Sequence, residues 1–289
     1  MPSKRLRRVD ETVDTVSPGN GYVLRLWPCD DGGVTATPDP SANDSRAISM
    51  LAGHPVTPPP LPRPVLARQR WGDLTFVHWP VHPESVADMY PPGTRPDVFA
   101  DGMTYVALVP FAMSGLGLGT APPIPYFGAF LETDIWLCSI DDAGRHGVLM
   151  RSVETARLAV VPLTRIVGLP STWARMRMTR SGDRVTYYSV RRWPRRRPRC
   201  RLTINVGEVV EPTPLEVWLT ARWGAHIRTP RRTWWIPDEH EPWPLRAAEI
   251  LDLDDDLLDA SGVRPAGPHL RALFSPGVRS RFGRPTVVR

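Results

Sequence analysis

The chain has 289 residues, and its 42% hydrophobic content predicts a globular protein with a sizeable core, which excludes a wholly disordered chain. No run of about 18 apolar residues occurs, so no membrane span is expected. The formal net charge is +6, yet the seven arginines of residues 191–201 alone contribute +7, so the basic character is local.

The three cysteines lie far apart and outside any CxxC pair. This spacing predicts free thiols, a cytoplasmic location and neither a disulfide framework nor a zinc site.

Residues 1–65 are predicted to be a disordered, proline-rich extension, and residues 66–289 a single domain. The extension holds eleven of the 34 prolines and shows no sustained period of 2 or 3.6 residues. Within it, residues 21–27 (GYVLRLW) predict one isolated strand. Met50 supports the hypothesis that the native chain starts there and that residues 1–49 do not belong to it.

From Trp71 onward the sequence predicts mainly strands separated by turns. Strands are expected at residues 74–81, 103–111, 127–140, 146–154, 172–180, 184–192 and 200–208. Because most of these strands are joined as hairpins, we expect an α+β fold whose antiparallel sheet is curved or closed into a β-barrel.

Few helices are expected beside this sheet. Residues 213–224 predict a helix, with Thr213 as N-cap, Pro214 at the first helical position and Glu216 completing a capping box. Shorter helices are expected at 83–90, at 155–168, where Pro162 must kink or divide the helix, and in the acidic segment 251–262.

Four segments in the same order resemble the YqjF-like family of uncharacterised bacterial proteins. They are LTFVHWPVHPESVADMYPPGTRPDVFADGMTYVALVPFAMSG, GLPSTWARMRMTRSGDRVTYYSVRR, HEPWPLRAAEI and LFSPGV, and the resemblance runs from about residue 70 to the C-terminus. The resemblance implies the acetoacetate-decarboxylase-like fold, a cone-shaped antiparallel β-barrel with flanking helices and an internal cavity. It implies no particular reaction.

The chain departs from these families at two points. Similar proteins have Asn and Arg where this chain has Asp134 and Trp136, so an acidic ligand held by that arginine would not be bound here. Acetoacetate decarboxylase acts through a lysine that forms a Schiff base. The only lysine is Lys4, in the predicted extension, so Schiff-base decarboxylation is not expected.

Strand parity indicates the candidate site. Glu132, Asp134 and Trp136 share one face of their strand, and carboxylates beside aromatic rings are typical of a cavity lining. Arg175, on the strand 172–180, is expected to meet these carboxylates inside the barrel, the alternative being an ordinary cross-strand ion pair. We assign Glu132 as the acid/base group, Arg175 as the anion-pairing group, and His78 as a further cavity candidate.

No metal or cofactor is expected. His78 and His82 would lie about 13 Å apart on an extended strand, too far for one ion. The segment 114–123 (SGLGLGTAPP) lacks the third glycine and the helix of a dinucleotide-binding loop, and predicts a lid-like loop instead. His240 is expected in a surface loop.

The arginine-rich stretch 191–201 (RRWPRRRPRCR) is predicted to be a hairpin loop. Arg195, Arg196, Arg197 and Trp193 are its candidate contacts to phosphates and bases. The favoured alternative is a solvated loop facing the acidic run 249–259, so no nucleic-acid partner is expected. The leading prediction is a cytoplasmic protein that binds a small acidic or carbonyl-containing organic molecule in the barrel cavity; its oligomeric state stays open.

Overall fold

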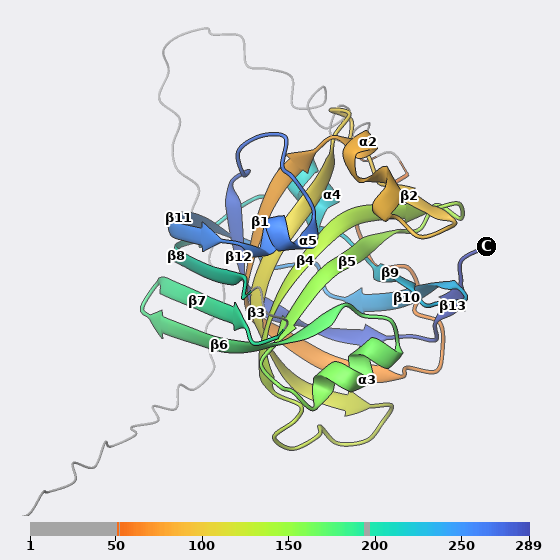
Figure 1. Cartoon of the computed structure of the whole chain (residues 1–289), viewed down its shortest axis with the longest axis horizontal. Coiled ribbons are helices and arrows are strands. Elements are labelled where there is room, and N and C mark those ends of the chain that lie inside the picture. Colours follow the sequence, from red (N-terminus) through yellow and green to blue (C-terminus); the bar gives the residue numbers. More distant parts are fainter. Residues whose placement is uncertain (1–50, 52, 194–196) are drawn as a thin grey trace, which may run out of the picture. The chain divides into compact units, whose positions relative to one another are not determined.

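The structure, a computed structural model, describes residues 51, 53–193 and 197–289 (Figure 1). The strand predicted at 21–27 and the candidate residues Arg195 and Arg196 lie outside the described residues. Residues 53–65, which belong to the predicted extension, contact the folded region. His54 is buried, and the indole nitrogen of Trp223 donates a hydrogen bond to the carbonyl of Pro55 at 2.6 Å.

The described residues form one sheet of thirteen strands with short helices around it. The strands are β1 (Ala67–Val81), β2 (Thr94–Pro96), β3 (Thr104–Leu118), β4 (Phe130–Asp141), β5 (His146–Thr155), β6 (Ser171–Ser181), β7 (Arg184–Arg191), β8 (Arg199–Val209), β9 (Gly224–Arg228), β10 (Thr233–His240), β11 (Arg246–Asp255), β12 (Ala272–Phe282) and β13 (Thr286–Val287). The helices are α2 (Pro83–Val86), α3 (Val160–Ile166), α4 (Pro214–Thr220), α5 (Leu257–Ser261) and the 3-10 helix η1 (Ala87–Met89).

Nine strands close into a hydrogen-bonded ring in the order β1-β3-β4-β5-β6-β7-β8-β11-β12. Strands β9 and β10 connect two of its members, because β9 pairs with β5 and β10 pairs with β12. A smaller ring therefore consists of β1, β3, β4, β5, β9, β10 and β12. The pairings are antiparallel, as predicted, except that β5 is parallel to both β6 and β9.

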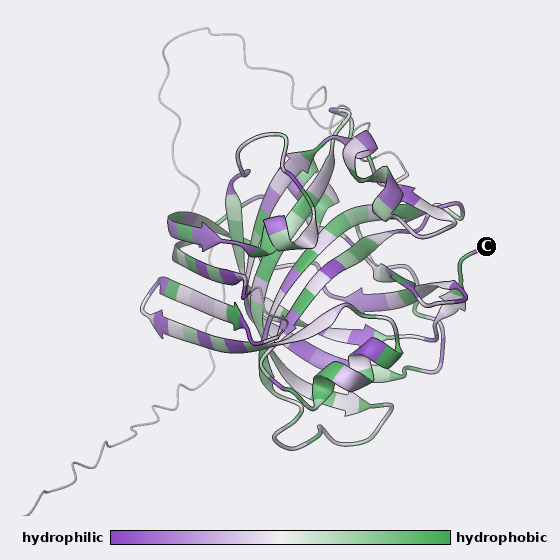
Figure 2. Ribbon diagram, viewed as in Figure 1, coloured by the Kyte–Doolittle hydropathy of each residue, from purple (hydrophilic) through white to green (hydrophobic). Residues whose placement is uncertain are grey.

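Side chains on the strands alternate between core and solvent, and Figure 2 shows the matching alternation of hydropathy along β6, β7 and β8. On β8, which lies between β7 and β11, Leu202 and Ile204 are fully buried, whereas Arg201 is exposed. The largest cluster of buried apolar side chains draws on both sides of the nine-strand ring, including Leu108 of β3 and Leu202 of β8. This period of two is the strand pattern that the sequence predicted.

The acidic helix predicted at 251–262 is wrong in its first half, because these residues continue strand β11 and only Leu257–Ser261 are helical. The acidic side chains lie opposite arginines of β8: Arg201 pairs with Asp252 at 2.8 Å, and Arg199 with Asp254 at 3.1 Å. These cross-strand pairs favour the strand over the local helical preference. The helix predicted at 155–168 is likewise shorter, at Val160–Ile166.

Helix α4 begins as predicted. The hydroxyl of Thr213 accepts a hydrogen bond from the backbone N–H of Glu216, and the Glu216 carboxylate accepts one from the Thr213 backbone. Arg271 also binds Glu216, with its Nη2 2.6 Å from Oε2. The capping box thus fixes the start of the helix that leads into the functional site described below.

We expect Thr213→Ala to lower the free energy of unfolding by about 1 kcal/mol, because the N-cap hydroxyl is lost. Urea unfolding followed by circular dichroism measures this change. Thr179→Ala, on the exposed edge of β6, is the control and should not destabilise the protein through a helix cap. Equal stability of Thr213→Ala and the parent would contradict the role of the cap.

Candidate ligand-binding cavity

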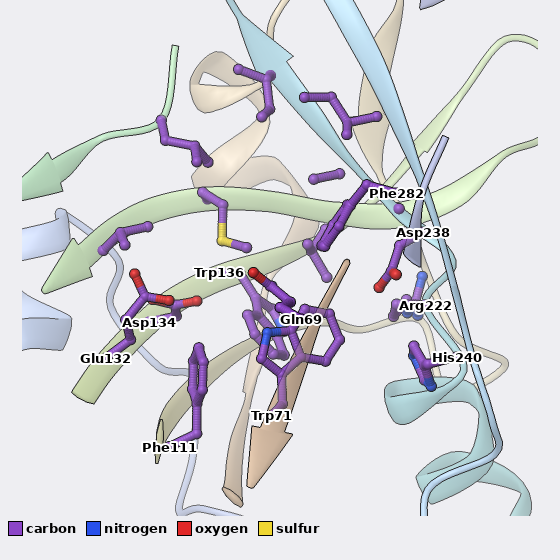
Figure 3. A pocket seen from close by; sticks show the side chains of 18 of the residues that line it. Gln69, Trp71, Phe111, Glu132, Asp134, Trp136, Arg222, Asp238, His240 and Phe282 are labelled. Carbon is purple, nitrogen blue, oxygen red and sulfur yellow. The ribbon is translucent and has the colours of Figure 1, made fainter. Parts of the chain in front are cut away.

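A cavity of about 430 Å³ lies inside the smaller ring (Figure 3). Strands β1, β3, β4, β5, β9, β10 and β12 all contribute to its wall, together with the C-terminal end of α4. Most of the lining is apolar and includes Leu74, Phe111, Met150, Ile227, Ile236 and Phe282. Such a space suits the apolar body of a small organic molecule.

Two carboxyl groups of β4 form one end of the cavity, Glu132 and Asp134 (Figure 3). Glu132 is half-buried and lines the cavity, and Asp134 is buried. Burial raises the pKa of Glu132 to about 8 and the pKa of Asp134 well above its usual range, with help from the charges of Glu132 and Glu154. Both groups therefore carry protons at neutral pH and can donate hydrogen bonds to a ligand.

The Oδ1 atom of Asp134 has no hydrogen-bond partner within the described part of the chain, and the same holds for the indole nitrogen of Trp136, two residues along β4. Both side chains line the cavity. Because buried polar atoms are usually hydrogen-bonded, these two point to a polar group on a bound molecule.

Behind this end of the cavity, a buried ion pair joins Glu154 of β5 to Arg191 at the end of β7. The Arg191 Nη2 atom lies 2.5 Å from Glu154 Oε1 and also donates to the hydroxyl of Ser152 at 2.9 Å. Glu154 is fully buried. The first residue of the arginine-rich stretch is thus bound into the interior of the protein.

Two predicted cavity residues lie elsewhere. Arg175 is exposed on β6 and does not line the cavity, so the expected pairing with Glu132 is wrong. The inner face of β6 is the other one: Ala174 is buried, and Met178 packs against the core. His78 is buried on β1 outside the lining, and burial, assisted by the charge of Arg222, lowers its pKa to about 3.

The opposite end of the cavity holds Arg222, which follows α4, with Asp238 and His240 of β10 (Figure 3). Arg222 is only 6% exposed; its guanidinium lies 3.9 Å from the centre of the Trp218 ring, and its Nη1 donates to Asp97. Its Nε and Nη2 atoms have no partner among the described residues. A guanidinium edge with two free donors at a cavity wall fits an anion.

Burial raises the pKa of Asp238 to about 7, against the opposing hydrogen bond from Ser280. Burial also lowers the pKa of His240 to about 4, so this imidazole is neutral at physiological pH. Its Nδ1 atom donates to the carbonyl of Glu241 at 2.6 Å, which leaves Nε2 as an acceptor. This end of the cavity, called the basic end below, therefore combines three groups: the cation of Arg222, the carboxyl of Asp238, which can gain or lose a proton near neutral pH, and the neutral imidazole of His240.

Aromatic rings form the walls between the two ends. Trp71 and Trp243 are stacked with centroids 5.9 Å apart, and Trp136 meets Phe76 edge to face at 6.3 Å. The ring of His240 packs 4.8 Å from that of Trp243. Flat apolar groups of a ligand are complementary to such walls.

Sequence reasoning missed the whole basic end. His240 was expected in a surface loop and is instead buried on β10. The available signal was the alternation of Asp238 and His240 in TWWIPDEH, which Pro237 and the adjacent tryptophans obscure. Arg222 follows a well-capped helix, and no local pattern marks it as buried.

The described residues of the arginine-rich stretch do not belong to the cavity lining. Arg199 and Arg201 pair with carboxylates of β11, and Arg192 lies over the ring of Trp173 at 4.4 Å. Trp193 is 65% exposed and Arg197 is exposed. The acidic run 249–259 thus faces the part of the stretch that belongs to β8, in line with the favoured interpretation of the sequence.

None of the helices in the described ranges has both the length and the hydropathy needed to cross a membrane. A family model, the domain of unknown function DUF2071, described as an uncharacterised conserved protein, matches residues 68–279. The uncharacterised protein YqjF of Bacillus subtilis (strain 168) is 27% identical over 206 residues, which cover 68% of this chain and 82% of YqjF. The resemblance predicted from the sequence is therefore confirmed.

Solved structures with the same fold are enzymes at low sequence identity. The enduracididine biosynthesis enzyme MppR complexed with pyruvate has a TM-score of 0.55 at 14% identity, over 81% of this chain and 91% of MppR. Acetoacetate decarboxylase from Legionella pneumophila has a TM-score of 0.53 at 13% identity, over 89% of this chain and 98% of that enzyme. An acetoacetate-decarboxylase-like enzyme from Sphingomonas wittichii RW1 has a TM-score of 0.55 at 12% identity, over 78% and 94% of the two chains.

Proposed function

This chain belongs to the DUF2071 family, and we propose that it binds a small organic acid in the cavity between β4 and β10. The ligand has a carboxylate, an apolar body and a second oxygen function such as a carbonyl. The observation that carries this proposal is the buried guanidinium of Arg222, with two donors that no described residue accepts from.

Arg222 remains charged although it is buried, so it requires a counter-charge. Asp97 supplies one through Nη1. The Nε and Nη2 atoms lie along another edge of the guanidinium, where they match the two oxygens of a carboxylate. A bound acid would therefore complete the hydrogen bonding of Arg222.

At the other end, Glu132, Asp134 and the indole of Trp136 offer donors to a carbonyl or hydroxyl oxygen. A carboxyl group with a pKa of about 8, such as that of Glu132, is suited to general acid/base work near neutral pH. No described residue of the cavity lining is a lysine, because the only lysine of the chain is Lys4. The proposed chemistry is therefore proton transfer to or from a ligand oxygen or an adjacent carbon, without a Schiff base.

Two further observations support this class of ligand. MppR, which shares the fold, has been solved in complex with pyruvate, an acid that carries a carbonyl. The cavity of about 430 Å³ is much larger than pyruvate, and its aromatic walls favour a longer, apolar acid. Trp136 stands where similar proteins have an arginine, and Arg222 supplies the cation from the opposite wall instead.

A thermal-shift screen of carboxylic acids against their matched primary amides tests the proposal. We expect a subset of acids with apolar bodies to raise the melting temperature and their amides to have no effect. Only the acids have a carboxylate, whose two oxygens can accept hydrogen bonds from both Nε and Nη2 of Arg222. Equal stabilisation by acids and amides, or none by either, would reject an organic-acid site.

For an acid identified in this way, we expect Arg222→Lys to weaken binding about tenfold or more, measured by titration calorimetry. Lysine keeps the positive charge beside Asp97 but cannot offer the two parallel donors of the guanidinium. Arg228→Lys, at the exposed end of β9, is the matched control and should bind like the parent. Unchanged affinity in Arg222→Lys would place the carboxylate elsewhere.

A further inference from the structure

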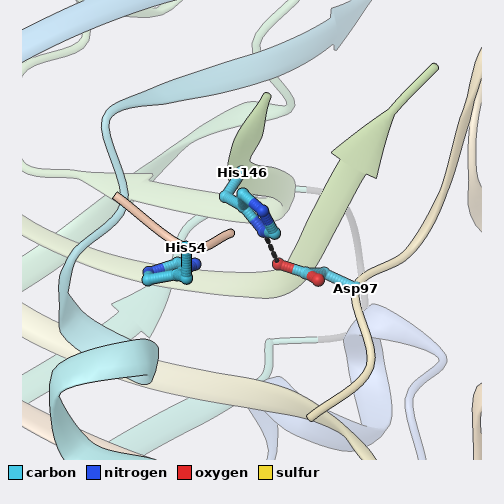
Figure 4. A group of neighbouring side chains, drawn as sticks. All are labelled: His54, Asp97 and His146. Carbon is cyan, nitrogen blue, oxygen red and sulfur yellow. Dashed lines mark hydrogen bonds and ion pairs between the residues drawn. The ribbon is translucent and has the colours of Figure 1, made fainter. Parts of the chain in front are cut away.

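Three side chains from distant parts of the chain meet beside Arg222 and outside the cavity lining: His54 before β1, Asp97 after β2 and His146 at the start of β5 (Figure 4). One nitrogen or oxygen of each lies within 4.8 Å of the others. The Nδ1 atom of His146 is 2.7 Å from Asp97 Oδ2, and the centroids of the two imidazole rings are 4.6 Å apart.

The cluster is buried and incompletely hydrogen-bonded. His54 is 7% exposed and Asp97 is 4% exposed. The Nε2 atom of His54 donates to the carbonyl of Ala221 at 3.0 Å, so Nδ1 carries a lone pair, and it has no partner within the described part of the chain. A buried acceptor without a partner is destabilising, and a bound ligand would supply the missing interaction.

We propose that His54, Asp97 and His146 bind a divalent first-row transition-metal ion, with Zn²⁺ as the representative ion. Two imidazoles and one carboxylate are a common protein ligand set for such ions, and they leave a coordination position open. His54 binds through Nδ1. His146 binds through Nδ1 when its ring proton moves to Nε2, which makes its short contact with Asp97 a contact between neighbouring ligand atoms.

The surroundings of the cluster match the outer partners that metal ligands usually have. A metal-bound imidazole normally donates its second N–H to a carbonyl or carboxylate, and His54 does so to Ala221. A metal-bound carboxylate is normally hydrogen-bonded as well, and Asp97 accepts from Arg222.

The guanidinium of Arg222 also opposes the charge of the ion. We therefore expect micromolar affinity, weaker than that of closed structural zinc sites. Because Arg222 contacts Asp97 on one side and lines the cavity on the other, the ion would also fix the position of the basic end of the cavity.

The test uses the full chain purified without a histidine tag and stripped with EDTA. Titration with Co²⁺, followed by its visible ligand-field absorption, and competition with Zn²⁺ give stoichiometry and affinity. We expect one ion per chain, with at least tenfold weaker binding in His54→Gln and in His146→Gln. His82→Gln, which replaces an exposed histidine outside the cluster, should bind like the parent.

Circular dichroism and melting curves in EDTA show whether each variant folds. If a glutamine variant does not fold, the parent decides alone: absence of a saturable Co²⁺ or Zn²⁺ site overturns the proposal. Binding of one equivalent by both folded glutamine variants with the affinity of the parent would overturn it as well. Loss of the site in these variants but not in His82→Gln supports it.

Discussion

Arg191→Met is expected to lower the free energy of unfolding by about 3–5 kcal/mol, because it removes the partner of a fully buried carboxylate. Glu154 accepts two of its hydrogen bonds from Arg191 Nη2 and Nε and another from Ser152. Without the guanidinium, one hydroxyl donor remains for a side chain that cannot reach water. Chemical unfolding of the purified protein measures the loss.

The double variant Arg191→Met/Glu154→Gln should recover much of this stability, since a neutral amide no longer requires a buried cation. Arg192→Met, one residue along and exposed over Trp173, is the matched control and should cost far less. If Arg191→Met and Arg192→Met had the same small effect, the ion pair would not be a structural anchor of this region. A large loss of stability in Arg191→Met would also show that Arg191 has a structural role that the exposed Arg192 does not have.

Raising the pH from about 7 to 9 is expected to destabilise the protein by about 1–2 kcal/mol through the carboxyl pair of the cavity. The folded-state pKa of Glu132, about 8, lies above its usual value of 4.5. Between these two pH values the folded protein therefore holds a proton that the unfolded chain has already released. This contribution to stability is fully present below about pH 4.5 and is lost as the pH rises through 8. The buried histidines, whose folded-state pKa values are lowered, act in the opposite direction but only below about pH 7. Asp134 and Asp238 act in the same direction.

Glu132→Gln should flatten this decline and should be more stable than the parent above pH 8, because the amide cannot ionise. Unfolding by urea at a series of pH values measures both slopes. Glu249→Gln, which replaces an exposed residue of β11, should leave the slope unchanged. Equal slopes for the parent and Glu132→Gln between pH 7 and 9 would show that the carboxyl of Glu132 is not held protonated by the fold.

The sequence predicted features that depend on neighbouring residues in the chain. The capping box of α4 is one, because Thr213 and Glu216 are only three residues apart. The shared face of Glu132 and Asp134 is another, since alternation within one strand sets it. Both come from local geometry that no distant contact can alter without breaking the element.

Features set by distant pairing could not be predicted. Alternation on β6 separates Arg175 from Ala174 but does not say which face is internal, and that depends on its partners β5 and β7. The acidic segment of β11 became a strand because β8 places arginines beside it. The basic end of the cavity depends on β9 and β10 connecting β5 with β12, which is a long-range arrangement.

The two rings of the sheet share β1, β3, β4, β5 and β12, so these strands serve the core on one face and the cavity on the other. On β4, for example, Ile135 belongs to the main core while its neighbour Trp136 lines the cavity. A change of cavity shape on a shared strand therefore perturbs the packing that holds the protein together. Strands β9 and β10 belong to the smaller ring alone, so ligand preference can diverge at Ile227 and Ile236 with the least cost to folding.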